Sequence, residues 1–431
     1  MKGIILTCRQ TSQLSSNLFH NFFSSLFFRL FCPHSLSHLI LSKQTFYSSY
    51  YPAHFLLPYS EISLMEKSDN TLSNWDILTP DLTELILSNL PIPSIIRASF
   101  VSKSWNSIIH SHSFKTRVSN SRRSPWFFVS GQNKNLPNKN YQVFAFDPDS
   151  NSWIKIPDTT TLLPKDSFTA SNGFFFRICS GKFNFKPVFS AAWRQTSPLR
   201  FSRCNPLVGN ETGCLKPAWF IVAGGLENSE ACLAVEIYNP DYNLWEISSP
   251  LPEILRPGIS SQTLCSALFN GKFYVHGIYS SFISSFDLEK RFWSNVQTLR
   301  PPGVMLSYLI SCRDQLVLAG LCSVNDELEF NIWKIDERTL EFREIGIMPS
   351  DLLSRFLDGQ WDHKFGSVKC VGSGNFVYVF NEERRSNHCA CFCEISDSGK
   401  CRWKRVPDLP EPVNELDKVM ISAFVPLMYP Y

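Results

Sequence analysis

Charged side chains are scarce in this sequence. They make up 18% of its 431 residues, and the net charge is only +3. A nearly neutral chain offers little electrostatic attraction to nucleic acid or to an anionic membrane, so we expect neither as a partner. Hydrophobic residues reach 44%, which is enough to form a core and argues against global disorder.

The signatures of covalent and metal chemistry are also missing. No Gly-x-Ser-x-Gly motif or phosphate-binding glycine loop occurs, and His276, His363 and His388 are isolated in the second half of the chain. Cys389, Cys391 and Cys393 alternate, so on a strand their side chains would be spaced about 6.6 Å apart, too far for one zinc ion. We therefore interpret them as packed thiols, and we expect no catalytic residue, metal site or cofactor.

The fourteen Cys are dispersed rather than regularly paired. This distribution is typical of reduced thiols, and it favours the nucleus and/or the cytoplasm over a secreted location.

Acidic residues are absent from the first 60 positions, which are rich in Ser, Phe and Leu and contain a few basic residues. That composition fits an organelle transit peptide. It equally fits a dispensable extension ahead of Met65. Met65 and the polar residues that follow it would make an ordinary N-terminus for a soluble protein. The apolar stretch 18–41 is interrupted by Arg29, by Pro33 and by several polar residues, so it is a poor membrane span. Residues 1–64 are left out of the fold prediction.

A short helical region is predicted at 75–118. Thr79 and Pro80 form a good helix start, since a capping hydroxyl precedes a proline in the first turn. Pro91 and Pro93 end this helix and begin a second, and a third begins near Ser102. Helices this short bury little apolar surface, and the region has no cluster of metal ligands and no Cys to stabilise it. A partner chain is the remaining source of stability.

The same region resembles an F-box. The family has a Leu-Pro start, a Leu-rich helix, a second Leu-Pro and a Val-Cys-Lys-x-Trp end. This chain departs from it mildly, because Thr79 separates the first Leu from its Pro and Ser102 replaces the Cys. The resemblance implies binding to a Skp-type adaptor through Leu78, Pro80, Leu82, Leu85, Ile86, Leu90, Pro91, Ile95, Ile96, Val101, Lys103 and Trp105.

A repeat follows the basic linker 119–125. Phe146 precedes Trp153 by seven residues, Tyr238 precedes Trp245 by seven, and two further copies end at Trp293 and Phe342. An apolar strand, a polar turn and a returning aromatic strand describe a β-hairpin. Repeat ends near 153, 193, 245, 293, 342 and 403 predict about six blades of a β-propeller over 126–431. The repeat tryptophans are interpreted as blade-packing residues.

The repeats are similar to those of the kelch family, although only Gly224 and Gly225 keep its double glycine. The fold class is therefore mainly β, a kelch-like propeller preceded by a three-helix F-box. The apolar C-terminal tail is expected to add a strand to the first blade and close the ring. Binding residues are expected in irregular stretches such as 195–216 and 351–368, where Arg355, Trp361 and His363 are candidates for contacting a target protein.

The resemblance of this chain to F-box/kelch proteins implies a function. The chain would be the substrate-recognition subunit of a Skp-cullin-F-box ubiquitin ligase, binding the adaptor and through it a cullin-RING ligase. It would hold an unknown target protein and carry out no chemistry itself. An adaptor-bound scaffold that sequesters its partner without degradation is the alternative. A propeller enzyme, such as a copper oxidase or a glycosidase, would need clustered ligands or paired carboxylates.

Overall fold

The computed structural model describes the chain from residue 78 to residue 426 with internal gaps. Those gaps, and the residues before and after this range, are outside the description. They comprise 1–77, 122, 134–140, 157–166, 180, 191, 212–218, 226–232, 257–262, 326, 358–366, 383–389, 410–415 and 427–431.

The helical region begins as its capping residues predict. The Thr79 hydroxyl accepts a hydrogen bond from the amide of Leu82, and Pro80 occupies the first turn of helix α2. Ser102 caps helix α4 in the same way, accepting from the amide of Trp105. The helices are α2 (Pro80–Ser88), α3 (Ile92–Ala98), α4 (Lys103–His110) and α5 (His112–Asn120).

The region contains four helices among the described residues, not three. The expected third helix ends at His110, because Ser111 adopts an extended conformation and its hydroxyl caps a new helix by accepting from the amide of Phe114. Phe114 is fully buried in a small core with Leu87, Ile95 and Ile109. Helix α5 also runs to Asn120, so the linker to the β domain is shorter than predicted.

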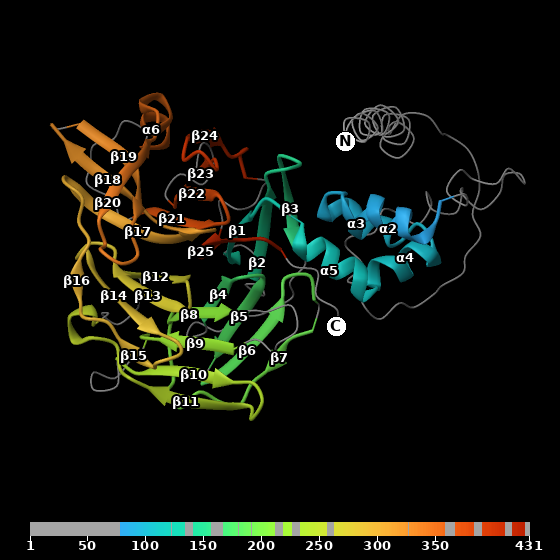
Figure 1. Ribbon diagram of the computed structural model, residues 1–431, viewed down its shortest axis with the longest axis horizontal. Helices are drawn as coiled ribbons and strands as arrows, with labels where there is room; N and C mark the ends of the chain where they lie inside the picture. Colours follow the sequence, from blue (N-terminus) through green and yellow to red (C-terminus); the bar gives the residue numbers. More distant parts are fainter. Residues whose placement is uncertain are drawn as a thin grey trace, which may run out of the picture. The chain divides into compact units, whose positions relative to one another are not determined.

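The rest of the described chain forms six antiparallel sheets, which confirms the six-bladed propeller (Figure 1). In chain order the first three sheets are β25 (Leu416–Phe424), β1 (Trp126–Asn133), β2 (Tyr141–Asp147) and β3 (Ser152–Ile156); β4 (Ser167–Ser171), β5 (Phe174–Cys179), β6 (Lys182–Pro187) and β7 (Arg194–Gln195); and β8 (Leu207–Glu211), β9 (Trp219–Ala223), β10 (Val235–Asn239) and β11 (Leu244–Ser248).

The next three sheets follow the same pattern, and the fourth carries an additional short strand, β16 (Gln297–Thr298), paired to β14. A single 3-10 turn, η3 (Glu253–Leu255), precedes that sheet. The strands are β12 (Leu264–Phe269), β13 (Lys272–Gly277), β14 (Phe282–Asp287) and β15 (Phe292–Trp293); β17 (Val304–Cys312), β18 (Gln315–Val324), β19 (Glu327–Ile335) and β20 (Phe342–Ile347); and β21 (Val368–Ser373), β22 (Phe376–Asn381), β23 (Ala390–Ile395) and β24 (Cys401–Arg405).

The C-terminal strand closes the ring, as the sequence predicts. β25 pairs antiparallel to β1, from Trp126 opposite Phe424 to Asn133 opposite Leu416. Figure 1 shows the red β25 alongside the teal β1. β25 also contacts β4 on one side and β21 on the other, and the first strands of all six sheets contact their neighbours in turn. One blade is thus built from both ends of the propeller, and β25 covers the inner edge of β1.

The seven-residue spacing of the repeat is a cross-strand register. Phe146 lies directly opposite Trp153, and Tyr238 lies opposite Trp245, with ring centroids 5.6 Å and 5.2 Å apart. The Asp or Asn after the first aromatic makes the turn, since the Asp147 carboxylate accepts the amide of Asp149. Aromatic cross-strand pairs stabilise a hairpin beyond their burial alone.

Three repeat tryptophans also join neighbouring blades. The Trp153 indole donates to the Pro407 carbonyl, Trp293 donates to that of Ser249, and Trp245 to the Thr196 hydroxyl, at 2.9–3.0 Å. Each acceptor follows the outermost strand of the preceding sheet. The prediction that these aromatics pack the blades is confirmed.

Two stretches expected to be irregular contain regular structure. The range 195–216 includes β8, the first strand of the third sheet, which the sequence hides because it is short and contains Gly209. The range 351–368 begins with helix α6 (Ser350–Leu357), which buries Leu353 and Phe356 three residues apart. None of the helices described is sufficiently long and apolar to cross a bilayer.

Candidate functional site

An exposed apolar surface covers one side of the helical module. Leu82 and Leu85 on α2 are 48% and 41% exposed, and Phe100 and Val101 before α4 are 39% and 50% exposed. The opposite sides of these helices are buried, with Leu87 at 1% and Ile109 at 1%. Apolar side chains left in water beside a well-packed core are typical of a surface that another chain covers.

Most of the predicted adaptor residues lie at or near this surface. Exposed or half-buried positions are Leu78, Pro80, Leu82, Leu85, Ile86, Leu90, Pro91, Val101, Lys103 and Trp105. Two predicted residues lie elsewhere. Ile95 is fully buried in the helical core, and Ile96 packs against a cluster that includes Trp126 and Phe128 of the propeller. These two side chains therefore have structural contacts of their own. Phe100, which the prediction left out of the adaptor set, adds to the apolar surface.

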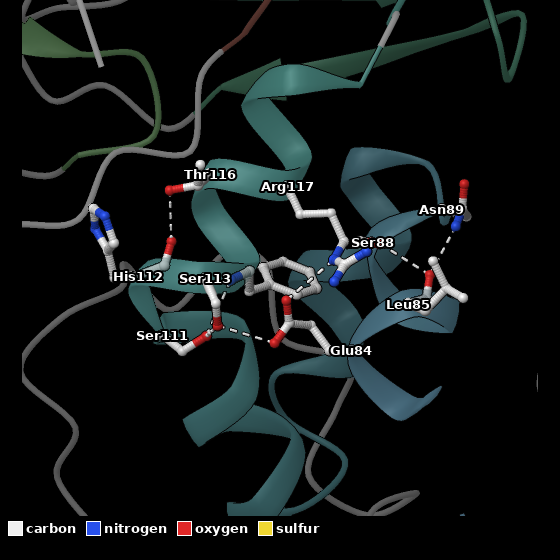
Figure 2. A network of polar contacts seen from close by, with 10 residues as sticks. Glu84, Leu85, Ser88, Asn89, Ser111, His112, Ser113, Thr116 and Arg117 are labelled. Carbon is white, nitrogen blue, oxygen red and sulfur yellow. Dashed lines mark hydrogen bonds and ion pairs between the residues drawn. The ribbon is translucent and has the colours of Figure 1, made fainter. Parts of the chain in front are cut away.

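A polar network lies beside this surface, between α2 and α5 (Figure 2). The Glu84 carboxylate accepts from the Ser113 hydroxyl at 3.0 Å and from the Arg117 guanidinium at 3.1 Å. Figure 2 shows Glu84 reaching from α2 toward these two residues of α5. No local sequence pattern indicates this contact, since the partners are 29 and 33 positions apart.

The network borders a hollow of about 630 Å³ that is lined by Leu85, Asn89, His112 and Thr116 among others. The Arg117 side chain is 49% exposed, so its ion pair with Glu84 contributes about 0–1 kcal/mol to stability. Its effect is geometric. It links α5 to α2 beside Leu85.

The propeller has two ends that differ in their connections. Strands alternate in direction, so turns from a first to a second strand, and from a third to a fourth, share one end. Connections from a second to a third strand, and from one sheet to the next, share the other end. Helix α6 connects β20 to β21 and therefore lies at this second end. The Phe356 carbonyl accepts from the Asn381 side chain at 3.1 Å, which fixes the helix there.

Of the three predicted target-binding residues, the structure describes one. Arg355 lies exposed on α6, at the end with the inter-sheet connections. Trp361 and His363 lie outside the described residues, so their predicted role stays a prediction.

The buried polar groups Arg203, Glu236 and His276 of the propeller contact other protein groups and have structural roles. Arg203 and Glu236 form an ion pair at 2.8 Å with no exposed side-chain surface. His276 is likewise fully buried, and its Nε2 lies 3.0 Å from the Ser307 hydroxyl. Burial lowers the pKa of His276 to about 4. A substrate could not reach either group without opening the fold.

The cysteines of the last sheet pack as thiols. Cys391 and Cys393 of β23 are buried in an apolar cluster shared by the fifth and sixth sheets, and Cys389 lies outside the described residues. Burial raises the pKa of Cys370 beside them. Within the part of the chain that the structure describes, no group of three His, Cys, Asp or Glu side chains is placed to hold a metal ion.

Comparison with known proteins agrees with this architecture. Residues 75–117 match the model of the F-box domain. An F-box/kelch-repeat protein of Arabidopsis thaliana is 27% identical over 344 residues, which is 76% of this chain and 84% of that protein. F-box only protein 13 of the same plant is 26% identical, over 81% of this chain and 84% of its own length.

A second F-box/kelch-repeat protein of Arabidopsis thaliana is 24% identical, over 74% of this chain and 83% of that protein. Each of these alignments covers about three quarters or more of this chain. The chain thus combines an F-box at 75–117 with a six-bladed propeller, and its sequence is similar to those of F-box/kelch-repeat proteins.

Proposed function

We propose that this chain is the substrate-recognition subunit of a Skp-cullin-F-box ubiquitin ligase. The observation that carries the proposal is the exposed apolar surface of Leu82, Leu85, Phe100 and Val101 on an F-box whose other side is packed. F-box and propeller occur together in relatives named F-box/kelch-repeat proteins, which supports a substrate-adaptor role.

The energetics favour a partner on this surface. Moving one Leu side chain fully out of water is worth about 1.5–3 kcal/mol, and several such side chains are half exposed here. The four helices alone have a small core, so a Skp-type adaptor that covers the surface would also stabilise the module. Lys103 and Trp105, at the start of α4, would extend the contact beyond the Leu residues.

The target protein would bind the end of the propeller that carries α6 and the inter-sheet connections. The linker from the F-box reaches the other end, because Ser124 donates to Asp149 in the turn between β2 and β3. A target on the α6 end would leave the linker and the F-box uncovered. Arg355, exposed on α6, is the described residue that we propose for this contact.

The mechanism would be proximity. The propeller holds a target so that its lysines lie within reach of the ubiquitin-charged enzyme carried by the cullin-RING ligase, and high local concentration replaces chemistry by this chain. F-box/kelch proteins are generally receptors without catalytic activity. We place the complex in the nucleus and/or the cytoplasm.

Co-purification with a Skp-type adaptor tests the proposal. We expect the full chain to form a stoichiometric complex, and the double variant Leu82→Asp, Leu85→Asp to lose it. The matched control is Ile247→Asp, Ile254→Asp, which changes two apolar residues of the propeller that are 59% and 53% exposed. The control should bind like the wild type. If the wild type ignored the adaptor, or if both variants bound equally well, the receptor function would be refuted.

A further inference from the structure

The short linker between the F-box and the propeller is fixed by contacts on both sides. It comprises residues 121–125, between the end of α5 and the start of β1. Arg123 is its central contact. The guanidinium donates to the carbonyl of Ser88 at 2.6 Å, at the end of α2, and to the carbonyl of Leu90 at 2.9 Å, in the turn that follows this helix.

The choice of these carbonyls is physically favourable. The last carbonyls of a helix lack partners within the helix and carry the negative end of its dipole, so they attract a cation. The Arg123 Nε also donates to the Ser121 hydroxyl at 3.1 Å, which fixes the plane of the guanidinium. Such a fork holds a geometry that a single ammonium could not.

Arg123 also faces the propeller. Burial lowers the pKa of its guanidinium, and the charges of Asp149 and Asp147 oppose that shift. Both acids belong to the β2–β3 turn of the first sheet, where Asp149 also accepts from the Ser124 hydroxyl at 2.6 Å. One cation thus lies between helix-end carbonyls of the F-box and carboxylates of the propeller.

Two further contacts hold the same junction. The Tyr378 hydroxyl of β22 donates to the Pro125 carbonyl at 2.7 Å, and the Tyr378 ring stacks on Phe127 with centroids 5.0 Å apart. Ile92, at the start of α3, is 2% exposed and belongs to the apolar cluster of Trp126. A hydrogen bond to Pro125, the Arg123 guanidinium and an apolar contact between Ile92 and Trp126 therefore lie together at this junction.

We propose that Arg123 is a positioning residue, which makes the linker an anchored joint so that the F-box and the propeller move as one body. Its purpose rests on the proposed function. A joint of this kind would hold a bound target at a constant distance from the ligase, whereas a flexible tether would let that distance vary.

Hydrogen exchange of the full chain, measured by mass spectrometry over residues 88–98, tests the joint. Loss of a charge-assisted hydrogen bond changes an opening equilibrium by about tenfold or more, so Arg123→Ala should speed exchange there by about that factor. The matched control is Arg117→Ala, which breaks an exposed ion pair inside the F-box and should change exchange by less than about threefold.

A second variant covers the case in which Arg123→Ala fails to fold. Tyr378→Phe keeps the stacked ring and removes only the hydroxyl that holds Pro125, and it too should speed exchange at the junction. Unchanged exchange in residues 88–98 of the folded variants would overturn the joint. Adaptor affinity is measured on the same samples and should stay at the wild-type value.

The two readouts separate the two proposals. A wild-type chain that does not bind the adaptor, but whose exchange responds to Arg123→Ala, would refute the receptor function and keep the joint. If the chain binds the adaptor but hydrogen exchange over residues 88–98 is unchanged in both variants, the receptor function would stand and the joint would be refuted.

Discussion

Acidification should destabilise the propeller through one histidine. His276 on β13 is fully buried, and its Nε2 contacts the Ser307 hydroxyl at 3.0 Å. Its Nδ1 has no hydrogen-bond partner among the residues that the structure describes. The thiol of the neighbouring Cys265 donates to the backbone carbonyl of His276. A charged imidazole would lose its hydration there without gaining a counter-charge, and this burial lowers the pKa of His276 from 6.5 to about 4.

The sign of the effect follows from proton binding. Below pH 6.5 the unfolded chain protonates this histidine, whereas the folded chain does so only below about pH 4. The unfolded state therefore binds more protons between these values, and stability falls as the pH falls. Each pH unit in that window costs about 1.4 kcal/mol, so the loss from this group is about 2 kcal/mol at pH 5 and about 3.4 kcal/mol at most.

Urea unfolding of the full chain at pH 7.5 and pH 5.0, followed by tryptophan fluorescence, measures this loss. Other groups also titrate, so the informative quantity is the difference between the wild type and His276→Gln. We expect the variant to be less stable at pH 7.5 but to lose about 2 kcal/mol less on acidification. His112→Gln, which removes an exposed imidazole of α5, is the control. Equal losses in the wild type and His276→Gln would refute the reasoning.

Two further changes should destabilise the propeller for different reasons. Arg203→Met removes the partner of the buried Glu236 and leaves the Gly224 carbonyl, which Arg203 also contacts, without its donor, so the free energy of unfolding should fall by about 3–5 kcal/mol. A double-mutant cycle with Glu236→Leu should show that the two costs do not add, and additive costs would contradict a coupled pair. Deletion of residues 416–431 removes β25 and leaves the inner edge of β1 unpaired, so the protein should aggregate or bind a hydrophobic dye such as ANS. A soluble, fully folded deletion variant by circular dichroism would show that ring closure is dispensable.

The propeller was largely predictable because its repeat has a direct geometric meaning. A separation of seven positions is what a tight hairpin requires to bring two aromatics opposite each other, as Phe286 and Trp293 are. The turn chemistry was equally visible, since Asp287 accepts from the amides of the turn that follows it. Local rules of this kind need no knowledge of the tertiary structure.

The features that sequence did not predict depend on residues distant in the chain or on weak local signals. β8 has only five residues, and its Gly209 lies where an added Cβ would meet the Phe273 ring at 2.8 Å, so the glycine reflects packing with the next sheet. The break at Ser111 is a single capping residue inside an otherwise helical pattern. The Arg123 contacts join residues 33 and 35 positions apart.

Ring closure and the F-box junction meet in the same sheet. β1 begins at Trp126, directly after the linker, and Trp126 pairs with Phe424 near the end of β25. Phe424 also stacks on Phe128 at 4.3 Å, and both belong to the cluster that includes Ile92 of the F-box. Loosening the C-terminal strand would therefore expose the apolar support of α3 as well as the inner edge of β1. The stability of the propeller's last strand and the anchoring of the adaptor-binding module are, in this chain, two consequences of one packed cluster.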